Sequence, residues 1–186
     1  FEHAWNEHAT TTTSEILDRL KDATVAITNK VPLRKETLSK LPKLTMIAVA
    51  ATGYDVVDID YCNAQGIAVA NIRNYAIHTV PEHAFALILA LRRNLLAYRR
   101  DVENGVWQQV DQFCFFNHPI GDLFGATLGI FGEGAIGQGI AKIARGFGMR
   151  VLFADHVPPK APGVEFTPQD TVLAESEVIS LHCPLT

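Results

Sequence analysis

Short apolar runs alternate with helical patterns through the first part of the chain. The runs at 24–28, 44–52 and 66–71 are apolar, rich in β-branched residues and too short for helices, so each predicts a strand. Residues 12–22 and 59–65, which lie between these runs, predict helices. Strands that alternate with helices in this way are typical of a parallel sheet with crossover helices.

Local signals mark the ends of the two short helices. Thr12 is followed three residues later by Glu15, which is the spacing of a capping box. Asp58 is a good N-cap for the helix at 59–65, and Gly66 is placed to end it.

The longest predicted helix runs from about residue 80 to Gly105. Thr79 and Glu82 have the spacing of a second capping box, and Pro81 falls in the first turn. The helix is apolar on nearly all sides as far as Leu91, which predicts burial between two bodies. Several arginines follow in its later turns, and we interpret them as a solvated helix end that complements the helix dipole.

A second alternating pattern occupies the last third of the chain. Residues 106–124 are irregular and aromatic, and they predict a connector packed on the surface. Apolar runs at 127–132 and 150–155 predict strands on either side of an amphipathic helix. A short helix at 171–176 leads into a last strand that ends in LHCPLT.

Closely spaced glycines join the strand at 127–132 to its helix. Gly132 would permit the tight turn, Gly134 would let a pyrophosphate approach the backbone, and Gly137 would let helix and strand pack closely. Ala135 and Ile136 complete the first helical turn, where free N–H groups and the positive end of the helix dipole favour phosphate. The pattern therefore predicts a dinucleotide-binding loop.

Residues at the ends of the two following strands complete this candidate site. Asp155 lies 18 residues after Gly137, the separation expected of an acid that accepts hydrogen bonds from the adenosine ribose. A carboxylate there repels a 2′-phosphate, which favours NAD over NADP. His182, Cys183 and Pro184 end the last strand and are candidates to line the cofactor.

Composition narrows the class of protein. The net charge of −4 gives no basic field for nucleic acid or an anionic membrane, and no apolar run is long enough to span a bilayer. The three cysteines are far apart and form no CxxC pair, so we expect neither a disulfide framework nor a metal site. This cysteine usage and the lack of a recognisable secretory signal favour a protein of the reducing cytoplasm.

Four segments together resemble the D-isomer-specific 2-hydroxyacid dehydrogenase family. They occur in the family's order and span most of the chain: AATGYDVVDID, TVPEHAFALILALRR, TLGIFGEGAIGQGIAKIARGFG and ISLHCPLT. The connector GVWQQVDQFCFFNHPIGDL is most similar to the branch of the family that acts on D-glycerate and hydroxypyruvate.

The resemblance implies a flavodoxin-like substrate domain and a Rossmann NAD-binding domain, both doubly wound parallel sheets. The expected boundaries are 1–78 for the substrate domain, 79–105 for a hinge helix and 106–186 for the first half of the NAD-binding domain. The resemblance also implies a homodimer in which the NAD-binding domain and the long arm of each subunit form the contact with the partner subunit.

The resemblance also implies which residues of the first domain bind substrate. Backbone N–H groups of Thr52, Gly53 and Tyr54 would bind the substrate carboxylate, and the strand-end position of Gly53 agrees with an anion nest. Thr79 would lie near the cofactor. Asn74 stands where the family often has Gly, and Asn tolerates the left-handed backbone that such a turn requires.

The family's catalytic Arg, Glu and His lie downstream of LHCPLT, so we expect no catalytic residue within this chain and no turnover by the chain alone. We expect both ends of the protein to extend beyond it. The expected activity is NAD-dependent oxidation of a small D-2-hydroxy acid by hydride transfer, with D-glycerate and hydroxypyruvate, or glyoxylate, as substrates. The alternative is an NAD-sensing, corepressor-like interaction protein of the same family.

Overall fold

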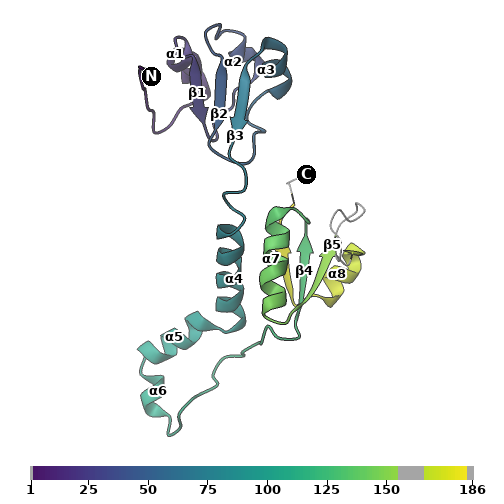
Figure 1. The fold of residues 1–186 in the computed structure, drawn as a ribbon. Helices are drawn as coiled ribbons and strands as arrows, with labels where there is room; N and C mark the ends of the chain where they lie inside the picture. Colours follow the sequence, from purple (N-terminus) through teal and green to yellow (C-terminus); the bar gives the residue numbers. More distant parts are fainter. Residues whose placement is uncertain (1, 155–165, 184–186) are drawn as a thin grey trace. The chain divides into compact units, whose positions relative to one another are not determined.

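The computed structural model describes residues 2–154 and 166–183, and the chain divides into two compact units, Phe1–Tyr75 and Ala76–Thr186 (Figure 1). The first unit is a three-stranded parallel sheet in the order β1-β2-β3. Its elements in chain order are η1 (Thr13–Glu15), α1 (Ile16–Leu20), β1 (Val25–Thr28), α2 (Lys35–Leu38), β2 (Met46–Val49), α3 (Ile59–Gln65) and β3 (Ala68–Asn71).

One face of this sheet forms the core of the first unit. Alternate side chains along β1 and β2, among them Ala26, Ile47 and Val49, are buried, while Val25 and Ile27 on the opposite face are exposed. This alternation is the period of two expected of a strand with one covered face. The strands and helices predicted in this part of the chain are therefore confirmed.

The predicted helix signals of the first unit are also present. The N–H of Thr12 donates to the Glu15 carboxylate at 2.8 Å, as in a capping box. The Asp58 carboxylate accepts the N–H of Tyr61 at 3.1 Å, and Gly66 ends α3 in the left-handed conformation with φ 70°.

The second unit is built on a four-stranded parallel sheet in the order β6-β5-β4-β7. Two helices, α7 and α8, alternate with its strands (Figure 1). The elements in chain order are α4 (Thr79–Arg92), α5 (Leu95–Glu103), α6 (Val106–Gln109), β4 (Thr127–Phe131), α7 (Ala135–Gly146), β5 (Arg150–Ala154), β6 (Phe166–Thr167), α8 (Gln169–Glu175) and β7 (Val178–Leu181).

The structure corrects the predicted long helix in two respects. It is broken into α4 and α5 at Asn94, which has a left-handed backbone with φ 49°. The predicted capping box does not form: α4 begins at Thr79 itself, His78 takes the N-cap position, and no side chain caps the helix. The apolar pattern of the sequence continues across Asn94, although the backbone turns there, so the pattern alone did not reveal the break.

Helix α4 packs against α7 through one face. Pro81, Phe85 and Ile88 are buried, and a Cβ added to Gly139 of α7 would lie 2.8 Å from the Pro81 ring. Other sides of α4 are exposed within the second unit, with Leu87 at 52% and Leu91 at 76%.

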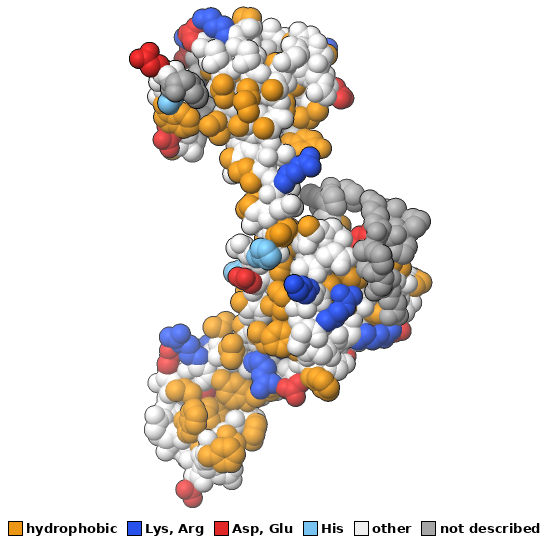
Figure 2. All heavy atoms as spheres, in the orientation of Figure 1, with side chains coloured by type: hydrophobic (Ala, Val, Ile, Leu, Met, Phe, Trp, Pro, Cys, Tyr) orange, Lys and Arg blue, Asp and Glu red, His pale blue; other side chains and the backbone are white. Residues whose placement is uncertain are grey.

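Residues 93–126, between α4 and β4, form a segment that reverses direction and that we call the arm. Residues 117–122, which we call the return strap, pass beside α5 and the C-terminal end of α4 and are joined to this region by hydrogen bonds (Figure 1). Side chains on the arm that remain largely exposed include four large apolar residues: Leu96, Phe113, Phe116 and Phe124. The arm is thus ordered locally but leaves much apolar surface uncovered (Figure 2).

Candidate functional site

The order of strands in the second unit creates a topological switch point. From β4 the chain crosses to β5 and β6 on one side of the sheet, and then returns to β7 on the other side of β4. Sequence reasoning missed β6, which is only two residues long, and so placed the last strand third rather than fourth. In open parallel sheets, ligands bind at the carboxyl ends of the strands where the order reverses, here between β4 and β7.

The loop after β4 and the end of β7 meet at this switch point. The N–H of His182 donates to the carbonyl of Phe131 at 2.7 Å. Gly132 has φ 101°, and a Cβ at this position would lie 2.5 Å from the carbonyl oxygen of His182. Both facts require glycine, because an L side chain would be strained and would collide with backbone.

Gly137 brings the start of α7 against the same loop. A Cβ there would overlap the carbonyl oxygen of Gly132, and the residue is buried. Since the obstacle is backbone, no side-chain rearrangement could relieve the collision. The close approach expected of this glycine from the sequence is therefore present.

Gly134 differs from these two glycines because its surroundings are open. It is exposed, it is the N-cap of α7, and a Cβ there would meet no atom within 4 Å. The first helical hydrogen bond runs from the Gln138 N–H to the Gly134 carbonyl at 2.9 Å. Helix geometry therefore leaves the N–H groups of Ala135, Ile136 and Gly137 without a partner inside α7.

These features fit a dinucleotide pyrophosphate. The loop offers several backbone donors at the positive end of a 12-residue helix, with space in front of Gly134 for close approach.

Of the strand-end residues predicted to line the cofactor, His182 is partly buried and Cys183 is exposed. The Nε2 atom of His182 and the hydroxyl of Ser180 lie 2.8 Å apart, within hydrogen-bond distance. Burial lowers the pKa of His182, which favours the neutral imidazole. Asp155 and Pro184 lie outside the residues that the structure describes.

Thr79 occupies the first position of α4, and the segment before it approaches α7. A Cβ on Gly139 would lie 3.0 Å from the carbonyl oxygen of Ile77, so this segment and the second turn of α7 are in contact. Thr79 itself is exposed.

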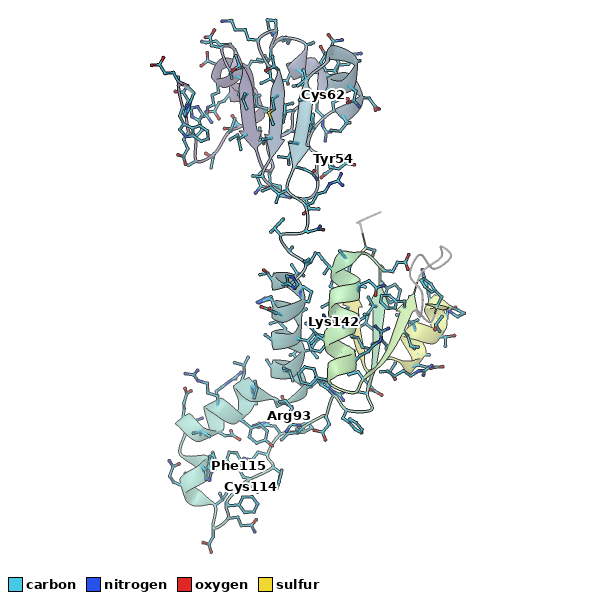
Figure 3. All side chains as sticks on the ribbon, viewed as in Figure 1. Tyr54, Cys62, Arg93, Cys114, Phe115 and Lys142 are labelled. Atoms are coloured by element: carbon cyan, nitrogen blue, oxygen red, sulfur yellow. The ribbon has the colours of Figure 1, made fainter. Side chains whose placement is uncertain are left out.

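The predicted carboxylate-binding loop lies in the first unit, directly after β2. Thr52, Gly53 and Tyr54 are all exposed, and Figure 3 shows Tyr54 at the end of the sheet where β3 ends. The side-chain amide of Asn71 donates to the Thr52 carbonyl at 2.7 Å and so ties this loop to β3. No described residue between 50 and 57 has a positive φ, so the loop lacks the alternating backbone of an anion nest.

The neighbouring turn after β3 behaves as its sequence predicts. Asn74 has φ 62°, the left-handed conformation that glycine usually supplies and that Asn tolerates.

Sequence reasoning missed the return strap, although its residues were recognised as an aromatic connector. The carbonyl of His118 accepts the Tyr98 hydroxyl at 2.8 Å, and the imidazole Nε2 of His118 lies 2.9 Å from the Asp101 carboxylate. Figure 3 shows Arg93 at the junction of α4 and the strap, where it pairs with Asp122. These partners are distant in sequence and only the fold brings them together.

No helix among residues 2–154 and 166–183 combines the length and the apolar character needed to cross a membrane. Over the same residues, His, Cys, Asp and Glu form no group of three or more that could hold a metal ion.

Comparison with known proteins identifies the class to which this fold and loop belong. Residues 85–186 match the family model of the D-isomer specific 2-hydroxyacid dehydrogenase NAD binding domain. The chain belongs to this family, and the glycine loop described above is part of its NAD-binding domain.

Curated relatives match all or most of the chain. A glycerate dehydrogenase of Methylorubrum extorquens is 50% identical over an alignment of 187 residues. This alignment covers 100% of this chain and 58% of the glycerate dehydrogenase. A hydroxypyruvate reductase of Blautia hydrogenotrophica is 38% identical over 92% of this chain and 54% of that protein. The chain thus spans little more than half the length of these relatives.

Solved structures share the fold of the two units. A D-lactate dehydrogenase from Aquifex aeolicus, solved with NAD and lactic acid, is 36% identical with a TM-score of 0.75, over 91% of this chain and 50% of that one. The TT0316 protein from Thermus thermophilus is 30% identical with a TM-score of 0.82, over 96% of this chain and 57% of that one.

Proposed function

We propose that the whole protein carrying this chain is an NAD-dependent oxidoreductase that interconverts a small 2-keto acid and the corresponding D-2-hydroxy acid. The preferred pair is hydroxypyruvate and D-glycerate, with glyoxylate as a second substrate, as in a glycerate dehydrogenase. The observation that carries this proposal is the open N-terminus of α7 beside Gly134, at the switch point between β4 and β7. The names of the similar proteins support the choice of substrate.

In this proposal the second unit holds the cofactor. The N–H groups of residues 135–137 bind the pyrophosphate, while Gly132 and Gly137 keep the loop and helix close enough to present them. Asp155 binds the adenosine ribose, and Thr79 and the chain at 182–184 line the remainder of the site. NAD(H), when bound, supplies the acceptor or donor of the hydride.

The first unit holds the substrate. The exposed backbone of Thr52, Gly53 and Tyr54 binds its carboxylate, and the bond from Asn71 keeps this loop in place. We assign the substrate domain to residues 1–78, the hinge to 79–105 and the first half of the NAD domain to 106–186. We propose that the catalytic Arg, Glu and His implied by the family resemblance belong to the part of the whole protein that follows residue 186.

The enzyme is favoured over a corepressor-like interaction protein, because the relatives named by activity are dehydrogenases and reductases. We also propose a cytoplasmic homodimer. The arm of each subunit supports this assembly, since it exposes Phe113 at 88% and Phe116 at 79%, and a monomer of a soluble enzyme rarely leaves such a surface uncovered.

A direct test assays the whole protein with NADH and NADPH on hydroxypyruvate and glyoxylate. We expect NADH to be preferred and hydroxypyruvate to be the better substrate. The 186-residue chain alone should bind NADH without turnover. Absence of NADH oxidation by the whole protein with either acid would refute the proposed activity.

The assembly has its own test. Phe113→Ser and Phe116→Ser, introduced together, should shift the molar mass measured by light scattering from dimer towards monomer. Leu173→Ser on α8 is a matched control, because it also removes an exposed apolar side chain but lies outside the arm. An unchanged mass in the double variant would show that the arm is not the interface.

A further inference from the structure

The three strands of the first unit end in register at one edge of the sheet. Thr28, Val49 and Asn71 are partners across β1, β2 and β3. Two residues beyond these positions, past the end of each strand, are Lys30, Ala51 and Arg73. The strand order places the loop after β2 between the loops that carry Lys30 and Arg73.

Hydrogen bonds keep the three strand-end loops side by side beyond the sheet. On the β1 side, the Ala50 N–H donates to the Thr28 carbonyl at 2.7 Å and the Leu33 N–H donates to the Val56 carbonyl at 2.8 Å. On the β3 side, the Ile72 N–H donates to the carbonyl of residue 51 at 3.1 Å, in addition to the side-chain bond to Thr52 described above. The central loop is therefore tied to both neighbours.

Each neighbouring loop contributes one cation. Lys30 and Arg73 are exposed, and neither makes a hydrogen bond or ion pair with another residue that the structure describes. Figure 2 shows basic side-chain atoms at the end of the first unit where the strands end. These charges are not used to hold the fold together, and both remain available to a ligand.

The central loop itself carries an acid. A Cβ on Gly53 would lie 3.3 Å from the Asp55 carboxylate, so this negative charge is beside the backbone proposed to receive a substrate carboxylate. Without the anion nest, exposed amides alone bind a carboxylate weakly. The two flanking cations offset Asp55 and leave this edge with a net charge of about +1, counting the three side chains at neutral pH.

We propose that Lys30 and Arg73 bind the carboxylate of the substrate together with the loop 52–54, and that Asp55 restricts this edge to acids with a single negative charge. This inference rests on the proposed function and adds to it two substrate-binding side chains and a determinant of substrate charge. Lys and Arg contacts to a carboxylate are charge-assisted, and charges at the rim of a site also accelerate capture of an oppositely charged ligand.

The test compares Lys30→Gln, Arg73→Gln and Lys40→Gln in the whole protein. Lys40 is a matched control: it is exposed, and it lies between α2 and β2 at the opposite edge of the sheet. We expect the first two variants each to raise the KM for hydroxypyruvate about three- to tenfold at low salt, with kcat and the KM for NADH within about twofold of the unmodified protein. Salt at about 0.5 M should reduce the difference by screening.

Asp55→Asn should act in the opposite direction. We expect a KM for hydroxypyruvate lowered about two- to threefold, and a larger drop in the inhibition constant of malonate, which carries two negative charges. Thermal unfolding of each variant separates a binding effect from a folding defect. Arg73→Lys keeps the positive charge and should therefore retain most of the affinity for hydroxypyruvate that Arg73→Gln loses.

The outcomes are distinguishable. If the unmodified protein reduces neither acid, the proposed function fails and this inference fails with it. If the protein is active and the KM of Lys30→Gln and Arg73→Gln equals that of Lys40→Gln at low salt, this inference alone is overturned. If Asp55→Asn leaves malonate inhibition unchanged, Asp55 does not select for charge.

Discussion

The loops after β4 and after β2 occupy equivalent places in two parallel sheets, yet they are built differently. The loop after β4 is fixed by backbone crowding, since Gly132 and Gly137 each leave no room for a side chain. The loop after β2 is exposed, has no left-handed residue and is held by the side chain of Asn71. A binding site formed by main-chain N–H groups depends on glycines that let backbone segments approach closely. A binding site formed by side chains at neighbouring strand ends depends instead on the register of the strands and on the charges of those side chains.

The largest effect is expected where crowding is backbone against backbone. Gly137→Ala should lower the free energy of unfolding by at least about 3 kcal/mol, because the added methyl would overlap the Gly132 carbonyl. Gly146 lies in the same helix, and a Cβ added there would meet no atom within 4 Å, so Gly146→Ala should instead raise the free energy of unfolding by about 0.5–1 kcal/mol. Urea denaturation of both variants measures the contrast, and equal stabilities would contradict the crowding argument.

Gly134→Ala should separate binding from folding. Its backbone has an ordinary φ of −61° and open surroundings, so stability should change by less than about 0.5 kcal/mol. The affinity for NADH should nevertheless fall about tenfold or more, because the methyl group occupies the space proposed for the pyrophosphate. Titration calorimetry measures the affinity, and an unchanged value would place the phosphates elsewhere.

Gly53→Ala tests the loop of the first unit. The nearest atom to the added methyl is a side-chain oxygen of Asp55 at 3.3 Å, which can move, and no positive φ is involved. Stability should therefore change by less than about 0.5 kcal/mol. A loss comparable to that of Gly137→Ala in the same denaturation experiment would show that the two loops are built alike after all.

The smallest effect concerns His182, at the end of β7. Burial lowers its pKa below the ordinary value for histidine, so the unfolded chain takes up a proton at a higher pH than the folded chain. Its contribution to stability is present above the ordinary pKa of about 6.5 and is lost as the pH falls below that value and through the lowered pKa of the folded state. Melting temperatures between about pH 7.5 and pH 5 should fall less for His182→Gln than for the unmodified protein. Parallel curves would assign the loss to other groups.

The sequence alone determined the features that depend on local geometry. The strands of both sheets other than β6, the helix between Asp58 and Gly66 and the turn at Asn74 follow from periodicity, capping residues and the backbone freedom of Gly and Asn. The glycine loop was readable for the same reason, because Gly132 and Gly137 are positions where only the absence of a side chain fits.

Only the tertiary structure decided features that depend on contacts between distant residues. The break at Asn94 was hidden by a continuous apolar pattern, and the pairing of His118 with Asp101 joins residues 17 positions apart. The position of β7 beside β4 depends on strand order, and so does the placement of the loops that carry Lys30 and Arg73 on either side of the loop after β2. Periodicity reports which face of an element is buried, but it does not report which other element lies next to it.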